Sequence, residues 1–201
     1  MSRRVTANLF TTLDGAVENP SSWQGDAFDE ILGEVMTETL SSVDDVLLGR
    51  ETYDFWASHW TREDVEDPFK SFINPVAKHV ASRTLKQHDV TWENCSVIDG
   101  DLMDFVRGLK GTQGRDISIQ GSLSIIAQLL EAGLLDRLTL FVHPVFAGPE
   151  RRLSDSMNLN RGALPLTLLD HRVNTKGTTV LVFGPAERSF PANCGEESPN
   201  K

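Results

Sequence analysis

The sequence has few cysteines and few basic residues for a chain of 201 residues. Its two cysteines, Cys95 and Cys194, exclude a disulfide framework and a cysteine-rich metal site. Their number leaves open whether they are free thiols in a reducing cytoplasm or form one long-range bridge. Lys and Arg number 19 against 29 Asp and Glu, a net charge of −10. This balance argues against a surface for nucleic acid or an anionic membrane, but it permits a local basic pocket for one phosphorylated ligand.

Long hydrophobic runs are also absent. No apolar stretch approaches the roughly 20 residues of a membrane span, and residues 5–12 are too short and too polar for the core of a signal peptide. We therefore expect a soluble, cytoplasmic protein. The length fits one domain, which we expect over residues 1–185, because no repeat or linker divides the chain. Residues 186–201 are polar and predict a flexible tail without a core.

Helical and strand-like segments alternate along the chain. Helical spacing of apolar residues or helix-forming composition occurs in 26–40, 51–60, 99–109 and 123–132, with Asp99 as the expected cap of the third. Strand-like segments are 5–13, 43–48, 76–81, 96–98, 116–120 and 136–142, followed by a hairpin of 164–173 and 178–183. This order predicts an α/β fold of three layers, with helices on both faces of a mixed, mostly parallel sheet that is antiparallel at one edge.

Three of the predicted strands end in residues suited to phosphate. Gly49-Arg50-Glu51-Thr52 leads into a helix, Ser82-Arg83-Thr84 places two hydroxyls around a guanidinium, and Gly121-Ser122 again begins a helix. Ligands of open α/β sheets bind at the carboxyl ends of the strands, where helix N-termini present free N–H groups. A glycine after a strand also serves simple turn geometry, but three such ends on one sheet edge favour a dinucleotide. Neither GxGxxG nor GxxxxGK[ST] occurs, which excludes the usual Rossmann and P-loop sites.

Five ordered motifs carry a family resemblance. They are Leu13-Asp14-Gly15, Leu48-Gly49-Arg50-Glu51-Thr52-Tyr53, Ser82-Arg83-Thr84-Leu85, Ile119-Gln120-Gly121-Ser122, and Leu134-Leu135-Asp136-Arg137-Leu138 with Pro144-Val145-Phe146-Ala147-Gly148. With these motifs the chain resembles the reductase domain of the bifunctional riboflavin-biosynthesis deaminase/reductase, within the dihydrofolate-reductase-like superfamily. The resemblance runs from about Arg4 to Pro185. It implies a dihydrofolate-reductase-like fold, NADPH as cofactor and a reductase of a small heterocyclic or glycosylamine substrate.

The resemblance also implies roles for particular residues. Phe10 would offer backbone to the nicotinamide carboxamide, Ser21 would lie near the substrate and Trp23 near the cofactor. The remaining cofactor-binding residues would be Gly49, Arg50 and Thr52 at the phosphates, Ser82 and Arg83 at the adenosine 2′-phosphate, and Gly121, Ser122, Leu123, Ser124 and Ile125 along the pyrophosphate.

The sequence departs from the riboflavin enzymes in two ways. The zinc deaminase half, with its H-x-E and P-C-x-x-C motifs, has no counterpart here, so we do not expect the preceding deamination step. Where those enzymes have a substrate-binding carboxylate two positions before the glycine, this chain has Ile119. The alternatives are therefore a dihydrofolate-reductase-like enzyme of another substrate and a non-catalytic NADPH-binding module.

Hydride transfer to a C=N or C=O bond benefits from a proton source. Asp26 is the predicted acid, because it lies at the start of the first helix as a dihydrofolate-reductase-like acid does; a helix N-cap is the competing interpretation. The histidines lack metal-ligand spacing and no G-x-S-x-G elbow occurs, so we expect neither a metal site nor hydrolase chemistry.

The last expectation concerns assembly. Apolar residues of the terminal strands, namely Phe141, Leu166, Leu168, Val180 and Val182, are expected on outward faces that one small sheet does not cover. Exposed strand edges pair readily with another chain, and members of the resembled family associate through these strands. We therefore predict a two-fold homodimer, with a monomer covered by helices as the alternative.

Overall fold

The computed structural model describes residues 3–159 and 162–186, so the expected tail after residue 186 lies outside the described residues. The strands are β1 (Val5–Thr12), β2 (Val43–Gly49), β3 (Ala77–Ala81), β4 (Cys95–Val97), β5 (Asp116–Gln120), β6 (Arg137–His143), β7 (Leu166–Val173) and β8 (Thr179–Pro185). The α-helices are α1 (Pro20–Trp23), α2 (Glu30–Ser41), α3 (Arg50–Trp60), α4 (Pro68–Ile73), α5 (Leu102–Lys110) and α6 (Leu123–Glu131), and the 3₁₀ helices are η1 (Gln87–Asp89) and η2 (Leu153–Ser156).

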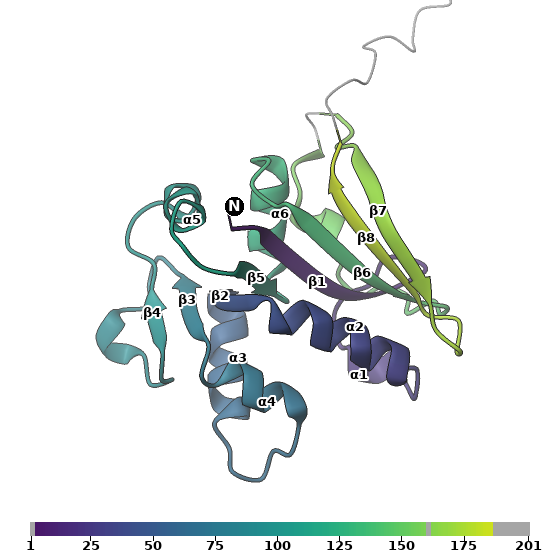
Figure 1. Cartoon of the computed structure of the whole chain (residues 1–201), viewed down its shortest axis with the longest axis horizontal. Helices are drawn as coiled ribbons and strands as arrows, with labels where there is room; N and C mark the ends of the chain where they lie inside the picture. The colour runs from purple at the N-terminus through teal and green to yellow at the C-terminus, as the bar shows by residue number, and fades with distance from the viewer. Residues whose placement is uncertain (1–2, 160–161, 187–201) are drawn as a thin grey trace, which may run out of the picture.

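The eight strands form one sheet in the order β4-β3-β2-β5-β1-β6-β8-β7. All pairs from β4 to β6 are parallel, and β8 pairs antiparallel with both β6 and β7. Helices α2, α3 and α4 lie on one side of the sheet and α5 and α6 on the other (Figure 1). The predicted three-layer α/β fold with its mostly parallel sheet and terminal hairpin is confirmed.

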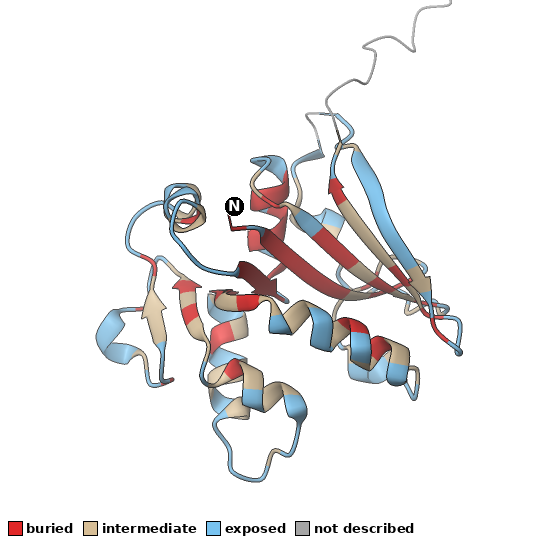
Figure 2. Cartoon of the chain, in the orientation of Figure 1, coloured by how far each residue is buried: buried red, intermediate tan, exposed pale blue. Residues whose placement is uncertain are grey.

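The two faces of the central strands differ in composition. On the side of α5 and α6, β1 and β5 contribute mostly apolar side chains such as Val5, Ala7 and Ile119, which pack against residues of both helices. The opposite side, which faces α2, carries buried polar side chains instead, namely Thr6, Asn8, Ser118, Gln120 and Thr139. These strands are buried along most of their length, whereas β7 is largely exposed (Figure 2). The central part of the sheet therefore has one face that packs in the apolar core and one face that carries polar groups.

Several predicted boundaries are wrong by a few residues. The helix expected from residue 26 begins at Glu30, where the Asp29 carboxylate accepts a hydrogen bond from the Leu32 N–H at 3.2 Å. Asp26 is therefore not its N-cap. Similarly, Asp101 rather than Asp99 caps α5, accepting from the N–H of Met103 at 2.8 Å. In both cases an aspartate closer to the first helical turn satisfies the free N–H groups.

The expected outward apolar face of the terminal strands is corrected in part. Phe141 and Val180 are 0% and 1% exposed, because they pack under α2 with Leu32 and Val35. The strand at the edge is β7, where Leu168 and its neighbours are exposed, and β6 lies inside the sheet. Within the part of the chain that the structure describes, no helix is long and apolar enough to cross a membrane.

Candidate functional site

A cleft of about 1100 Å³ lies at the carboxyl ends of β2, β3 and β5. Its lining brings together three predicted groups of residues: Gly49, Arg50 and Thr52 after β2, Ser82 and Arg83 after β3, and Gly121 to Ile125 after β5. The segments 17–18 and 98–102 complete the wall together with Arg151. The three strand ends that the sequence singled out thus share one cavity.

The floor of the cleft joins the ends of β2 and β5. The Gly49 N–H donates to Ser122 Oγ at 2.6 Å, and the Thr52 hydroxyl lies 2.9 Å from the same oxygen. A Cβ on Gly49 would stand 3.0 Å from Ser122 Oγ, so a side chain there would crowd this joint. Glycine at residue 49 therefore allows the ends of β2 and β5 to meet closely at the floor of the cleft.

Two helices point their N-termini at the cleft. The N-cap residues are Gly49 for α3 and Ser122 for α6, and neither provides a side-chain cap. Gly121 takes a φ of 77°, a left-handed conformation that suits glycine and turns the chain into α6. The side chains of Leu123 and Ile125 point into the apolar core, so only their backbone can serve a ligand. Uncapped N–H groups with the positive end of each helix dipole attract anions.

Three guanidinium groups line the cleft. Arg50 is held by Asp54 at 2.7 Å, and Arg83 is exposed next to Ser82, whose hydroxyl accepts from the N–H groups of Thr84 and Leu85. Arg151, which the sequence analysis missed, lies 3.2 Å from Glu18. The only signal for it was a pair of arginines shortly after the Pro144–Gly148 motif. Glu18, Glu51 and Asp101 also line the cleft, so three carboxylates balance its three guanidinium groups, and Arg83 is the one of the three without an ion pair among the described residues.

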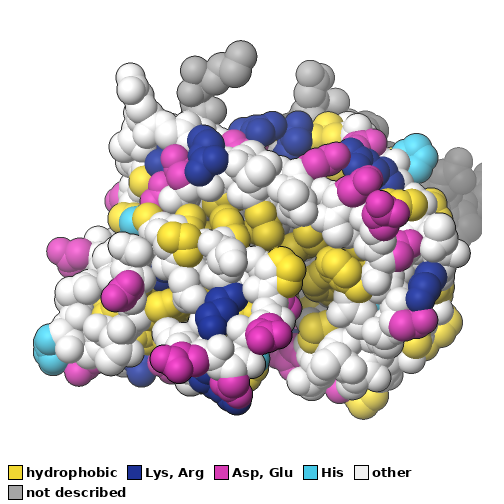
Figure 3. Space-filling model, turned by 60° about the horizontal axis from the view of Figure 1, so that its bottom comes forward, with side chains coloured by type: hydrophobic (Ala, Val, Ile, Leu, Met, Phe, Trp, Pro, Cys, Tyr) yellow, Lys and Arg dark blue, Asp and Glu magenta, His cyan; other side chains and the backbone are white. Residues whose placement is uncertain are grey.

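An aromatic cluster adjoins the cleft at the carboxyl end of β1. The rings of Phe10 and Trp23 both make edge contacts with His143, with centroids 5.9 and 5.3 Å away, and Phe28 lies 6.5 Å from Phe10. The Trp23 indole donates to the carbonyl of Glu18, which lines the cleft. Figure 3 shows hydrophobic side chains gathered along a hollow of the molecular surface, with both acidic and basic side chains around it. Phe10 and Trp23 therefore lie beside the cleft rather than in its wall.

Two predicted residues lie apart from this cluster. Ser21 is exposed on α1. Asp26 is exposed in the loop before α2, and its carboxylate pairs with Lys176 of the terminal hairpin. The hydrogen bond from Lys176 lowers the pKa of Asp26, whereas an acid that donates protons near neutral pH needs a raised pKa. The role of Asp26 as a proton donor stays a prediction that this geometry does not favour.

A polar side chain beneath α2 was missed by the sequence analysis. Asn8 lies on β1 between Gln120 of β5 and Thr139 of β6 in the strand register, and it is 8% exposed. Both atoms of its amide group lack a hydrogen-bond partner within the described residues. Ile119 is fully buried in the apolar core on the other face, so it cannot stand in for a substrate-binding group. Gln120, the next residue, faces the same side as Asn8.

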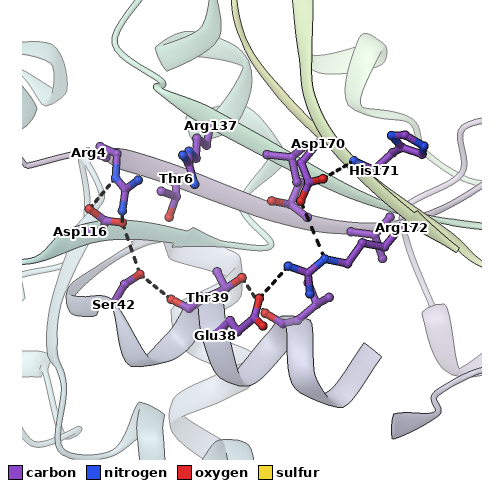
Figure 4. A pocket seen from close by; sticks show the side chains of 14 residues that line it. Arg4, Thr6, Glu38, Thr39, Ser42, Asp116, Arg137, Asp170, His171 and Arg172 are labelled. Atoms are coloured by element: carbon purple, nitrogen blue, oxygen red, sulfur yellow. Dashed lines mark hydrogen bonds and ion pairs between the residues drawn. The ribbon is translucent and has the colours of Figure 1, made fainter. Parts of the chain in front are cut away.

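A second cavity of about 210 Å³ lies at the opposite ends of the central strands, under the last turns of α2 (Figure 4). Ion pairs form its walls: Arg4 binds Asp116, and Arg172 joins Glu38 of α2 at 3.0 Å to Asp170 of its own strand at 3.8 Å. These contacts fix the C-terminal end of α2 against the hairpin. The cavity shares no lining residue with the large cleft.

A Ser–His–Asp row crosses three adjacent strands. His79 of β3 lies 3.1 Å from the Ser96 hydroxyl and 2.6 Å from the Asp45 carboxylate. Arg3 also pairs with Asp45 and with Asp44, so the carboxylate is already neutralised by a buried cation. None of these side chains lines either cavity. We interpret the row as a polar ladder that ties strand edges together, because a nucleophile needs access to its substrate.

Comparison with known proteins places the chain in a family. Residues 3–181 match the RibD C-terminal domain, and the chain belongs to that family. It is 27% identical to an uncharacterized protein, YyaP, of Bacillus subtilis (strain 168), over 187 residues that cover 90% of this chain and 94% of that protein. The family resemblance drawn from the five motifs is confirmed.

Solved structures share the fold. A putative riboflavin biosynthesis protein from Shewanella sp. PV-4 superposes with a TM-score of 0.69 at 19% identity, covering 93% of this chain and 100% of that chain. The deaminase/5-amino-6-(5-phosphoribosylamino)uracil reductase of Thermotoga maritima gives 0.65 at 13% identity, covering 92% and 57%. Dihydrofolate reductase from Enterococcus faecalis, complexed with NADP(H), gives 0.56 at 12% identity, covering 93% and 100%. These likenesses establish a dihydrofolate-reductase-like fold, and the family membership supports a reductase.

Proposed function

We propose that the protein is a reductase that takes its hydride from NADPH. The observation that carries this proposal is the cleft in which three strand ends, two uncapped helix N-termini and the side chains of Arg50, Arg83 and Arg151 meet. Each of these features favours phosphate oxygens, and NADPH has three phosphate groups. The missing Cβ of Gly49 lets the Ser122 side chain join the ends of β2 and β5 beneath this group of residues. The residues present thus fit the cofactor that relatives of this fold bind.

We propose a role for each part of the cleft. Arg83 and Ser82 would hold the 2′-phosphate, because they follow the strand farthest from the helix α6 terminus among the three strand ends. The N-terminus of α6 and the joint of Gly49 with Thr52 would hold the pyrophosphate. The nicotinamide, which supplies the hydride, would then reach toward Phe10 and Trp23.

The substrate would lie on the polar side of β1, beneath α2. Asn8 provides an unpaired amide there, and Gln120 lies beside it at the end of β5. An amide offers one acceptor and two donors, which match the ring edge of a small heterocycle or a glycosylamine. Two relatives of this fold bear names from riboflavin biosynthesis, and we propose a substrate of that chemical class, with Ser21 at its outer side.

The exposed position of Asp26 favours the alternative of a binding module without a proton donor. Asp26→Asn separates the two interpretations. If Asp26 donates the proton, this variant loses turnover while its affinity for NADPH is unchanged. The assay follows NADPH absorbance with a ribosylamino-pyrimidine and, in parallel, with dihydrofolate. If NADPH is not oxidised in the presence of either substrate, only the interpretation as a binding module is left.

Cofactor choice is tested by one side chain. Arg83→Ala should weaken NADPH binding by roughly 1.5–3 kcal/mol, the scale of a hydrogen bond to a charged group, and leave NADH binding unchanged. Arg107→Ala, an exposed arginine of α5 outside the cleft, is the matched control. Equal weakening of both cofactors would show that Arg83 is structural and that the 2′-phosphate lies elsewhere.

We further propose a cytoplasmic homodimer. Leu166, Leu168, Leu169 and Val173 are all exposed on the edge strand β7, and an apolar edge strand favours pairing with a second copy. Light scattering at micromolar concentration tests this: we expect about twice the 22.3 kDa of one chain. A mass of one chain would end the dimer proposal.

A further inference from the structure

His143 is a buried imidazole at the meeting point of the aromatic cluster. It ends β6, is 1% exposed, and lies against the ring edges of both Phe10 and Trp23. These are the two residues assigned above to the nicotinamide end of the cofactor. Neither the family motifs nor the spacing of the histidines pointed to this side chain.

The hydrogen bond that His143 makes fixes its tautomer. Its Nδ1 lies 3.1 Å from the carbonyl oxygen of Phe141, and a carbonyl only accepts, so Nδ1 carries the proton. Nε2 is then a lone-pair acceptor. Burial lowers the pKa of His143, which favours this neutral form.

This acceptor is left without a donor. Nε2 is buried and has no hydrogen-bond partner within the described residues. Leaving a buried polar atom unpaired is costly, and such exceptions in folded proteins call for a specific explanation. The rings of Phe10 and Trp23 that contact the imidazole offer no N–H toward it, because the Trp23 indole already donates to Glu18.

The cover over His143 is small. Trp23 ends α1, a helix of only four residues in which no residue is buried. Trp23 is one of the two rings in contact with the imidazole, so a shift of this short segment would remove one side of its cover and leave Phe10 in place. The unpaired atom therefore lies one side chain away from the site proposed for the nicotinamide.

We propose that Nε2 of His143 accepts a hydrogen bond from the carboxamide NH₂ of the bound nicotinamide. This inference rests on the proposed use of NADPH. His143 is in this view a cofactor-positioning residue, which turns the nicotinamide about its glycosidic bond so that one face meets the substrate. This hydrogen bond does not involve the 2′-phosphate, so it should form with NADH as well as with NADPH.

The test uses a cofactor analogue that lacks the donor. In the 3-acetylpyridine analogue of NADPH a methyl group replaces the carboxamide NH₂. Dissociation constants from tryptophan fluorescence are measured for wild type, His143→Phe and His143→Gln, with His88→Phe, an exposed histidine on η1, as the control. We expect His143→Phe to bind NADPH about tenfold more weakly and to bind the analogue as the wild type does. His143→Gln, which keeps an acceptor oxygen, should recover part of the affinity, and the melting temperature of free His143→Phe should not fall.

Other results would overturn the inference. Equal loss for NADPH and the analogue, or a lower melting temperature with that loss, would show that His143 only supports the fold. If His143→Phe leaves cofactor binding unchanged but raises the KM for the ribosylamino-pyrimidine, Nε2 accepts a hydrogen bond from the substrate and not from the cofactor. Suppose that wild type binds NADPH, that Arg83→Ala weakens NADPH binding but not NADH binding, and that His143→Phe leaves the affinity for NADPH unchanged. The inference about His143 then fails, and the proposed function stands. If wild type binds no NADPH, the proposed function fails with it.

Discussion

Replacement of Asn8 by leucine should make the protein more stable and less active. Asn8 sits in the middle of the central strand β1, 8% exposed, with neither amide atom paired within the described residues. Leucine has nearly the same shape and no polar atoms. If Asn8 serves the fold, its replacement should lower the stability of the protein. If Asn8 serves a ligand, its replacement should raise that stability.

The magnitude follows from the burial of the amide. A buried donor or acceptor without a partner costs about 1–3 kcal/mol, and Asn8 leaves both a donor and an acceptor unpaired. Removal of the amide should therefore raise the free energy of unfolding by about 1–3 kcal/mol. For a chain near 200 residues, this corresponds to a melting temperature higher by roughly 2–12 °C.

Calorimetry of the free protein and turnover with the ribosylamino-pyrimidine measure the two halves of the prediction. The matched control is Thr178→Val, which removes a fully buried hydroxyl that also lacks a partner among the described residues and lies outside the cleft. It should also stabilise the protein, but turnover should not change. A lower melting temperature for Asn8→Leu would refute the reasoning, because it would mean that the folded protein already satisfies the amide.

The architecture was readable because the chain repeats one pattern. Strand-like segments such as 43–48 and 116–120 end at Gly49 and Gly121, and glycine after a strand marks the turn into a helix. The meeting of three strand ends then follows from the rule that ligands of parallel sheets bind at the carboxyl ends of the strands. For the same reason the residues after β2, β3 and β5 came together in one cleft.

What the sequence could not show depends on contacts between distant segments. Asn8 in a strand gives no sign that its amide lacks a partner, because Gln120 and Thr139 come from elsewhere in the chain. Similarly, the sequence pattern predicts that Phe141 faces outward on a terminal strand, whereas in the structure α2 packs over it. Helices α1 and α4, with four and six residues, are too short for a helical period to be seen.

Further predictions concern stability. Arg3→Ala should destabilise the protein by about 1.5–3 kcal/mol in urea unfolding, because it removes the buried guanidinium that pairs with the partly buried Asp44 and Asp45; an unchanged midpoint would contradict this. The hydrogen bond from Thr12 outweighs burial and, with the N–H groups of Ala147 and Gly148, lowers the pKa of Asp14 to about 2. Its stabilisation is therefore present above about pH 4 and lost as the pH falls toward 2, so the difference in melting temperature between wild type and Asp14→Asn should shrink over that range.

The division of the sheet into an apolar and a polar face connects these predictions. On the side of α5 and α6, Val5, Ala7, Ile117 and Ile119 close a continuous core, and that side can supply stability whatever the ligand. On the other side, α2 packs Leu32 and Val35 on Phe141 and Val180, and polar contacts hold its two ends to the hairpin, Asp29 with Thr175 and Glu38 with Arg172. A polar face under a helix held at its ends costs stability but can exchange its unpaired groups for those of a ligand. Substitutions on the first face should therefore change mainly the melting temperature, and those on the second mainly binding and turnover.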